Sequence, residues 1–264
     1  MNHSISKPAQ LLLMCVLLLS PVFTHADKIS ELDTLMEMSG INTQMGNIPE
    51  QFNAGLQQGA TQAGAPQEFT DNLTQSFSGA LSSMDILGEI RNALNEGMTE
   101  GEIARLNGWY SSDLGKKITR LEVKASSNDE AQYVASNLDG LLANHERVGM
   151  ARRIEGALGG SDLTVTMMKS MQLTMVNAMM GDAPQAQREA VYSQIDQQMD
   201  LAIPQIKQMA LASYVHTYSS LSDTELNAYV DFLSEPEAAK FYDLTVSSVG
   251  AALGNLVGSA FSGN

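Results

Sequence analysis

The stretch Thr99-Glu-Gly-Glu-Ile-Ala-Arg-Leu-Asn-Gly-Trp-Tyr-Ser111 recurs in altered form 123 residues later as Ser222-Asp-Thr-Glu-Leu-Asn-Ala-Tyr-Val-Asp-Phe-Leu-Ser234. Both begin with Thr or Ser followed three residues on by Glu. This is the capping-box pattern, in which each side chain bonds the other residue's backbone amide at a helix start. Apolar residues then recur every three or four positions, as on one face of an α-helix. Each stretch therefore predicts one amphipathic helix, and the two predict the same helix twice.

A second helix is expected directly after each of these stretches. Ser111 and Ser234 can cap a new helix, and Pro236 stands near its first turn, where a missing amide costs little. The pattern thus predicts a helix, a tight corner and a second helix, used twice. The motif positions that we expect to shape this unit are Thr99, Glu102, Trp109, Ser111, Lys117, Ser222, Glu225, Phe232, Ser234 and Lys240.

These motif positions resemble the family known as domain of unknown function 2059. The shared pattern is Ser/Thr-x-x-Glu, an aliphatic residue, an aromatic residue, Ser, a small residue and Lys. The copy at residues 221–245 is closer to this pattern than the diverged copy at residues 98–122. The resemblance implies an exported, all-helical bacterial protein without an established activity. It implies no catalytic residues.

The remaining chain also has the pattern of an all-α protein. Residues 128–158 are predicted to form one long helix that joins two pseudo-repeated helical modules, residues 27–127 and 159–264. Gly159-Gly160 followed by Ser161-Asp162 marks a boundary, because Gly ends helices while Ser and Asp cap them. Further helices are predicted at 29–39, 41–58, 66–82, 84–96 and 163–180, at 185–219 with a kink or a split at Pro204, and at 246–261.

Residues 1–26 have the pattern of a secretory signal peptide. Lys7 precedes the apolar run 11–19, Ser20-Pro21 ends that run, and Ala26 provides the small residue that cleavage requires. The run is about half of the roughly 20 apolar residues that a membrane span needs. We therefore expect an exported protein, periplasmic in preference to extracellular, without a transmembrane span after cleavage.

The chain carries 15 Lys and Arg against 30 Asp and Glu, a net charge of −15. Binding to nucleic acids and to anionic lipid surfaces relies on Lys and Arg that neutralise phosphates. The charge balance therefore argues against both kinds of partner.

The candidate metal ligands are thioethers on the predicted helix 163–180. Four methionines spaced by four residues share one face of it: Met167, Met171, Met175 and Met179. Thioethers are soft ligands that select Cu(I). The same stripe also suits a packed core face, because Met fills irregular spaces, or an adaptable groove for a peptide or lipid chain. His145 and His216 each lack a second ligand at helical spacing, so no zinc site is predicted.

No familiar catalytic motif is present in the chain after residue 26. It has no Gly-x-Ser-x-Gly elbow, no Ser-x-x-Lys and no phosphate-binding glycine loop. We therefore expect no enzyme activity and no cofactor. The expected function is a non-catalytic envelope or periplasmic protein that binds an unknown protein or an apolar small ligand. The alternatives are Cu(I), lipid or apolar-ligand binding through helix 163–180, and third a hydrolase that uses carboxylates.

Overall fold

The computed structural model describes residues 25–47, 85–180 and 183–259, together with scattered single residues between 50 and 75. Every regular element in this part of the chain is an α-helix, which confirms the predicted all-α class. The apolar run of the predicted signal peptide and most of the predicted helix 66–82 lie outside the described residues. None of the described helices has both the length and the apolar character that crossing a bilayer would require.

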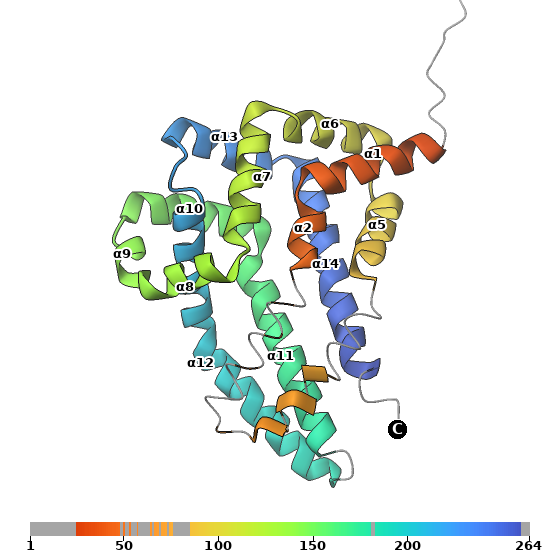
Figure 1. Cartoon of the computed structure of the whole chain (residues 1–264), viewed down its shortest axis with the longest axis vertical. Helices are drawn as coiled ribbons and strands as arrows, with labels where there is room; N and C mark the ends of the chain where they lie inside the picture. The colour runs from red at the N-terminus through yellow and green to blue at the C-terminus, as the bar shows by residue number, and fades with distance from the viewer. Residues whose placement is uncertain are drawn as a thin grey trace, which may run out of the picture.

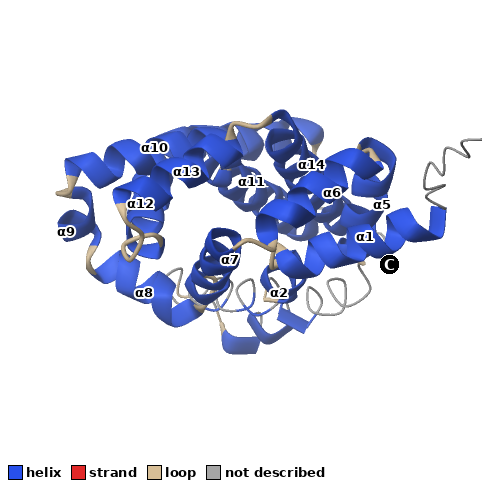
Figure 2. Ribbon diagram, turned by 90° about the horizontal axis from the view of Figure 1, so that it is seen from above, coloured by secondary structure: helices blue, strands red, loops and turns tan. Residues whose placement is uncertain are grey.

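The helices are labelled as in Figure 1. They are α1 (His25–Met38), α2 (Ile41–Gly46), α5 (Ile86–Gly97), α6 (Glu100–Tyr110), α7 (Asp113–Ala125), α8 (Asn128–Ser136), α9 (Leu138–Leu142), α10 (His145–Leu158), α11 (Gly160–Met179), α12 (Gln185–Thr217), α13 (Asp223–Leu233) and α14 (Pro236–Ser259). Helices α1, α6 and α13 lie across one end of the molecule, and α11 pairs with α12 in a long hairpin that reaches the other end (Figure 1). Seen from above, α7 and α2 lie near the middle of the molecule, with α8 and α9 toward one end and α5 toward the other (Figure 2).

Both predicted capping boxes are present. The Thr99 hydroxyl accepts from the amide of Glu102 at 3.3 Å, and the Glu102 carboxylate accepts from the amide of Thr99 at 2.7 Å. Ser222 and Glu225 make the same two bonds at 3.3 and 2.8 Å. Helices α6 and α13 accordingly begin with the same device and have the same length of 11 residues.

The larger of two hydrophobic clusters among the described residues joins the two predicted modules. Leu32 and Ile103 from residues 27–127 and Tyr229 and Phe241 from residues 159–264 are fully buried in the same cluster. Helix α14 packs against α5, and α1 packs against α6. The two predicted modules therefore form one body around a shared interior.

The prediction of one continuous helix over residues 128–158 is wrong, because this stretch forms three helices, α8, α9 and α10. Asn137 ends α8 and donates its side-chain amide to the carbonyl of Tyr133 at 2.8 Å. Asn144 caps α10 by accepting from the amide of Arg147 at 3.2 Å. Asn side chains compete with the helical ladder for backbone groups, and the two Asn residues therefore divide the stretch.

The predicted N-caps at Ser111 and Ser234 are also wrong, because each of these serines ends the preceding helix, α6 or α13. Ser112 caps α7 by accepting from the amide of Gly115 at 3.0 Å. Ser111 instead ends α6 and donates to the carbonyl of Gly108 at 2.9 Å. The corner between α6 and α7 is therefore one residue longer than the capping pattern indicated.

Helix α12 has nearly the predicted bounds 185–219, whereas α14 is longer than predicted. Helix α12 continues through Pro204 without a split, because packing against α11 and α10 holds its two parts and offsets the lost bond. Helix α14 unites the second motif helix with the predicted helix 246–261. Helix α2 is a short part of the predicted helix 41–58, and the predicted helices 29–39, 84–96 and 163–180 correspond to α1, α5 and α11.

Gly115 is the small residue of the motif. It is small because α7 begins in close contact with the end of α6. A Cβ added at Gly115 would lie 2.3 Å from the carbonyl oxygen of Trp109, which is a backbone atom that cannot move aside. At Gly108 in α6, by contrast, an added Cβ would meet nothing within 4 Å.

We predict that Gly115→Ala destabilises the protein by about 1–3 kcal/mol, because an overpacked contact must move the backbone. The matched substitution Gly108→Ala should raise stability by up to about 1 kcal/mol, since Ala favours a helix interior. Urea unfolding followed by circular dichroism measures both. Equal effects of the two substitutions would contradict the close approach.

Candidate functional site

The predicted motif residues of the two segments contact each other across the fold. Lys117 donates to the carboxylate of Glu225 at 2.7 Å, and Lys240 donates to both oxygens of Glu102 at 3.1 Å. Each motif Lys thus bonds the capping-box Glu of the other segment. The pKa of Glu102 is lowered to about 2, chiefly by the amide of Thr99 and then by Lys240. The pKa of Glu225 is lowered to about 2, chiefly by Lys117.

The motif aromatics also meet. The rings of Trp109 and Phe232 are stacked with centroids 3.6 Å apart and planes 8° apart. The ring of Tyr229 is stacked near Trp109, with centroids 5.8 Å apart and planes 26° apart, and Tyr110 meets Phe232 edge-on at 5.8 Å. The motif residues therefore join the two segments at their equivalent positions. The duplication of one ancestral unit stays a prediction.

We predict that Lys117→Met lowers stability at pH 7, because it removes the cation that Glu225 bonds. The folded pKa of Glu225 lies below its ordinary value of 4.5, so this contribution is present above pH 4.5 and is lost as the pH falls toward 2. The unfolding midpoints of variant and wild type should therefore converge between pH 4.5 and 2. Lys116→Met, on the exposed face of the same helix, should not show this convergence.

The methionine stripe is only partly described. Its backbone lies in α11, and Met167 is half-buried and packs against the hydrophobic core. The side chains of Met171, Met175 and Met179 lie outside the described residues. Met167 therefore fits the core interpretation, and Cu(I) binding by the stripe stays a prediction.

The two histidines that were considered as metal ligands, His145 and His216, lie in different environments. His145 is exposed at the start of α10. His216 lies 2.5 Å from a carboxylate oxygen of Glu130 and packs against the ring of Tyr133. Across the described part of the chain, no three His, Cys, Asp or Glu side chains converge as metal ligands would.

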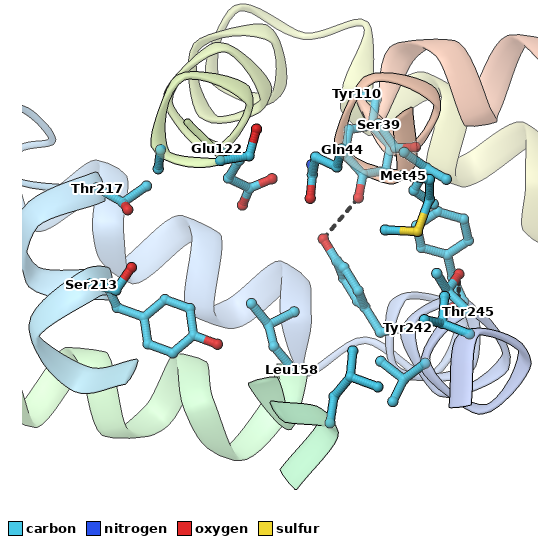
Figure 3. A pocket seen from close by; sticks show the side chains of 18 of the residues that line it. Ser39, Gln44, Met45, Tyr110, Glu122, Leu158, Ser213, Thr217, Tyr242 and Thr245 are labelled. Atoms are coloured by element: carbon cyan, nitrogen blue, oxygen red, sulfur yellow. Dashed lines mark hydrogen bonds between the residues drawn. The ribbon is translucent and has the colours of Figure 1, made fainter. Parts of the chain in front are cut away.

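A cavity of about 320 Å³ lies between α2, α7, α12 and α14, next to the junction of α10 and α11 (Figure 3). We call it the central cavity. Most of its wall is apolar, including the side chains of Ile41, Leu158, Leu163, Phe241, Val246 and Val249. Cavities of this size and character are typical of small-molecule sites.

Besides hydroxyl and amide side chains such as those of Gln44, Ser213 and Thr217, the central cavity is lined by the carboxyl of Glu122 on α7. One of its oxygens, Oε1, accepts from the hydroxyls of Tyr218 at 2.7 Å and Tyr229 at 2.6 Å. Burial raises the pKa of Glu122 above its ordinary value of 4.5, and the two hydroxyls oppose the shift. The site therefore favours the protonated, neutral form of this carboxyl more than water does.

The tyrosines around the cavity form a hydrogen-bonding set. The hydroxyls of Tyr110 and Tyr242 are 2.9 Å apart, and Figure 3 shows the Tyr242 ring and the Glu122 carboxyl reaching into the same space. Burial raises the pKa of Tyr110, Tyr218, Tyr229 and Tyr242 above the usual range. These hydroxyls therefore stay protonated and offer neutral hydrogen bonds.

The motif reasoning did not identify Glu122 or this tyrosine set. A signal was present, because Glu122 follows the buried residue Ile118 by four positions and so shares its helical face. Tyr214 and Tyr218 likewise share one face of α12 and stack at 6.3 Å. The sequence therefore indicated a carboxyl on an otherwise apolar helical face. It did not indicate which residues of other helices contact this carboxyl.

We predict that Glu122→Gln stabilises the protein more at pH 8 than at pH 4. The folded pKa of Glu122 is raised, so its charged form costs stability once the pH rises above 4.5 and through the folded pKa. Gln stays neutral and can still accept from the two tyrosines. The difference in unfolding free energy between variant and wild type, measured at the two pH values, tests this.

Glu130→Gln is the matched control. The pKa of Glu130 is lowered, chiefly by His216 and then by Lys124, so its charge stabilises the fold above pH 4.5. This variant should lose more stability at pH 8 than at pH 4. The same pH trend in both variants would contradict the assignment for Glu122.

The fold and the cavity define an all-α protein whose two halves share a core and border a partly open cavity of about 320 Å³. Residues 85–135 match the family model described as "Uncharacterized protein conserved in bacteria (DUF2059)", which confirms the predicted resemblance. The matched residues run from the cap of α5 into α8 and contain the first motif copy and Glu122. The sequence pattern had favoured the second copy, which lies outside this match. No curated protein and no solved structure matched the chain.

Proposed function

We propose that this protein is a non-catalytic binding protein for a small, mostly apolar ligand that occupies the central cavity. The observation that carries the proposal is a space of about 320 Å³ with apolar walls and one buried carboxyl at its side. Apolar surface left against water costs about 25 cal/mol per Å², and a ligand that covers the wall recovers this free energy.

The polar groups of the cavity suit an uncharged hydrogen-bonding group on the ligand. Both tyrosine bonds fall on Oε1 of Glu122, so its second oxygen is the one that faces a ligand. In its protonated form the carboxyl donates to a carbonyl or hydroxyl oxygen. The hydroxyl pair of Tyr110 and Tyr242 adds a second neutral group across the cavity.

The composition of the wall favours binding over hydrolysis. Glu122 is the one carboxyl among the described residues that line the central cavity, and that lining includes no His, Lys or Arg. Hydrolysis by carboxylates uses an acid and a base at the reacting bond. A single carboxyl held by two tyrosines serves recognition better than proton transfer in both directions.

The methionine-rich helix takes part in this proposal through its first turn. Leu163 of α11 lines the central cavity, and Met167, one turn further on, packs against the core. The predicted signal peptide places the binding activity outside the cytoplasm, in the periplasm if the protein is retained there. Carriage or storage of an apolar compound in an aqueous compartment fits these features.

We predict that the purified protein binds the neutral apolar dye Nile red and that Ser213→Trp weakens this binding at least tenfold. Ser213 lines the cavity from α12, so a large ring at this position fills the space. Fluorescence titration measures the affinity, and mass spectrometry of an organic extract shows whether an apolar compound copurifies.

Leu201→Trp is the matched control, because Leu201 lies on the same helix with 83% of its surface exposed. It should leave dye binding unchanged. Unfolding midpoints near the wild-type value confirm that both variants are folded. Failure of the wild-type protein to bind the dye, together with extracts free of apolar compounds, would overturn the proposed function.

A further inference from the structure

The hydrogen bonds of Glu122 determine where its proton lies. Oε1 accepts from the hydroxyls of Tyr218 at 2.7 Å and Tyr229 at 2.6 Å. A carboxyl oxygen has two lone pairs, and these two bonds use both of them. When Glu122 is protonated, its proton is therefore on the second oxygen, Oε2. The carboxyl then accepts through Oε1 and donates through Oε2.

The donor on Oε2 faces the central cavity. Glu122 lines this cavity from α7, and Figure 3 shows its carboxyl in the same space as the ring of Tyr242. Among the described residues no group bonds Oε2, whereas both tyrosines that hold Oε1 are buried. The fold thus fixes one oxygen of the carboxyl and leaves the other for a group that occupies the cavity.

The chemistry of the wall selects the ligand group that accepts this bond. An ammonium group has no lone pair, and a carboxylate would be buried without a cation, because the described lining has no Lys, Arg or His. A hydroxyl accepts one bond but adds a proton that needs an acceptor of its own, and Oε1 of Glu122 is already saturated. A carbonyl oxygen accepts without adding a donor.

Resting on the proposed function, we propose that the ligand of the central cavity carries an uncharged carbonyl group, whose oxygen accepts the proton that Glu122 holds on Oε2. The carbon skeleton of the ligand lies against the apolar and aromatic wall, to which Tyr214, Phe241 and Tyr242 contribute their rings. Binding is noncovalent, and the proton stays on the carboxyl.

The groups around Glu122 stay neutral while Glu122 itself titrates. The titratable groups that face it are tyrosines of four helices, Tyr110 of α6, Tyr214 and Tyr218 of α12, Tyr229 of α13 and Tyr242 of α14. Burial raises the pKa of each tyrosine above its ordinary value of 10. Helix α2 contributes the neutral Gln44. On α8, Glu130 is bonded to Lys124 and His216.

The carbonyl contact therefore depends on pH through Glu122. Its pKa is raised above 4.5 by burial, so more of it is protonated at pH 5 than in water. As the pH rises through this pKa, Oε2 changes from a donor to an acceptor. A ketone then loses its hydrogen bond, while an alcohol gains one.

Three probes with the same skeleton test this inference: the ketone benzophenone, the alcohol diphenylmethanol and the hydrocarbon diphenylmethane. At pH 5 we expect benzophenone to bind at least about threefold more tightly than diphenylmethane, as one net hydrogen bond provides. At pH 9 benzophenone should lose this advantage, and diphenylmethanol should bind more tightly than benzophenone. Displacement of Nile red measures the three affinities.

Glu122→Gln removes the titration and keeps the donor. Its amide oxygen accepts from the two tyrosines in place of Oε1, so its NH₂ group faces the cavity. This variant should prefer benzophenone to diphenylmethane at both pH values. Glu130→Gln makes the same change at a carboxyl that does not line the cavity, and it should keep the pH-dependent reversal of the wild type. Unfolding midpoints confirm that each protein is folded at both pH values.

Infrared spectra add a measurement that does not depend on affinity. The stretching band of the bound benzophenone carbonyl is identified with an isotopic label on the carbonyl carbon. In the wild type this band should lie at lower frequency at pH 5 than at pH 9, because a donated hydrogen bond weakens the carbonyl double bond. In Glu122→Gln the band should have the same position at both pH values.

The outcomes separate the two proposals. If neither diphenylmethane nor Nile red binds at either pH, the proposed function fails. If they bind, but benzophenone has no advantage over diphenylmethane at pH 5 or keeps the same advantage at pH 9, the carbonyl contact with Glu122 is wrong and the central cavity remains a binding site. A pH-dependent reversal in Glu122→Gln would assign the effect to another group and would also overturn the inference.

Discussion

The stacking of Trp109 on Phe232, enclosed by two crossed Lys–Glu pairs, is the contact on which the arrangement of the helices depends. The rings are in van der Waals contact at 3.6 Å, and the lysines hold the capping-box carboxylates of the opposite segments. Exposed ion pairs contribute little stability on their own. Here the two Lys–Glu pairs determine how the two helix corners align with each other. Burial of the aromatic rings provides most of the free energy of the contact.

The central cavity follows from this contact. In α7 the motif residue Lys117 precedes the cavity residue Glu122, and in α14 Lys240 precedes the cavity residue Tyr242. Lys117 thus fixes the start of α7 to α13, and Lys240 fixes the start of α14 to α6. The following turns of α7 and α14 line the central cavity together with α2 and α12 (Figure 3). The motif residues that join the helices therefore also determine where the central cavity lies, although they do not line most of it.

The local features of this fold could be predicted from the sequence because their causes are local. The capping boxes of α6 and α13 need four neighbouring residues, and they are present as predicted. The breaks at Asn137 and Asn144 were missed because helical periodicity continues across them, and only the side-chain bonds of the Asn residues decide the outcome. The candidate site could not be assembled at all, since the partners of Glu122 come from α12 and α13, more than 90 residues away in the chain.

Glu122 could be understood as a purely structural residue that ties Tyr218 to Tyr229, and the energetics argue against this. A buried carboxyl whose pKa is raised costs stability at neutral pH, and an apolar side chain of similar volume usually packs at no such cost. Its two tyrosine bonds also engage a single oxygen, which is half of what the carboxyl can accept. A group that is costly to the fold and only half used by it, placed at the wall of an apolar cavity, is what the proposed ligand-binding role predicts, with the ligand bonding the other oxygen.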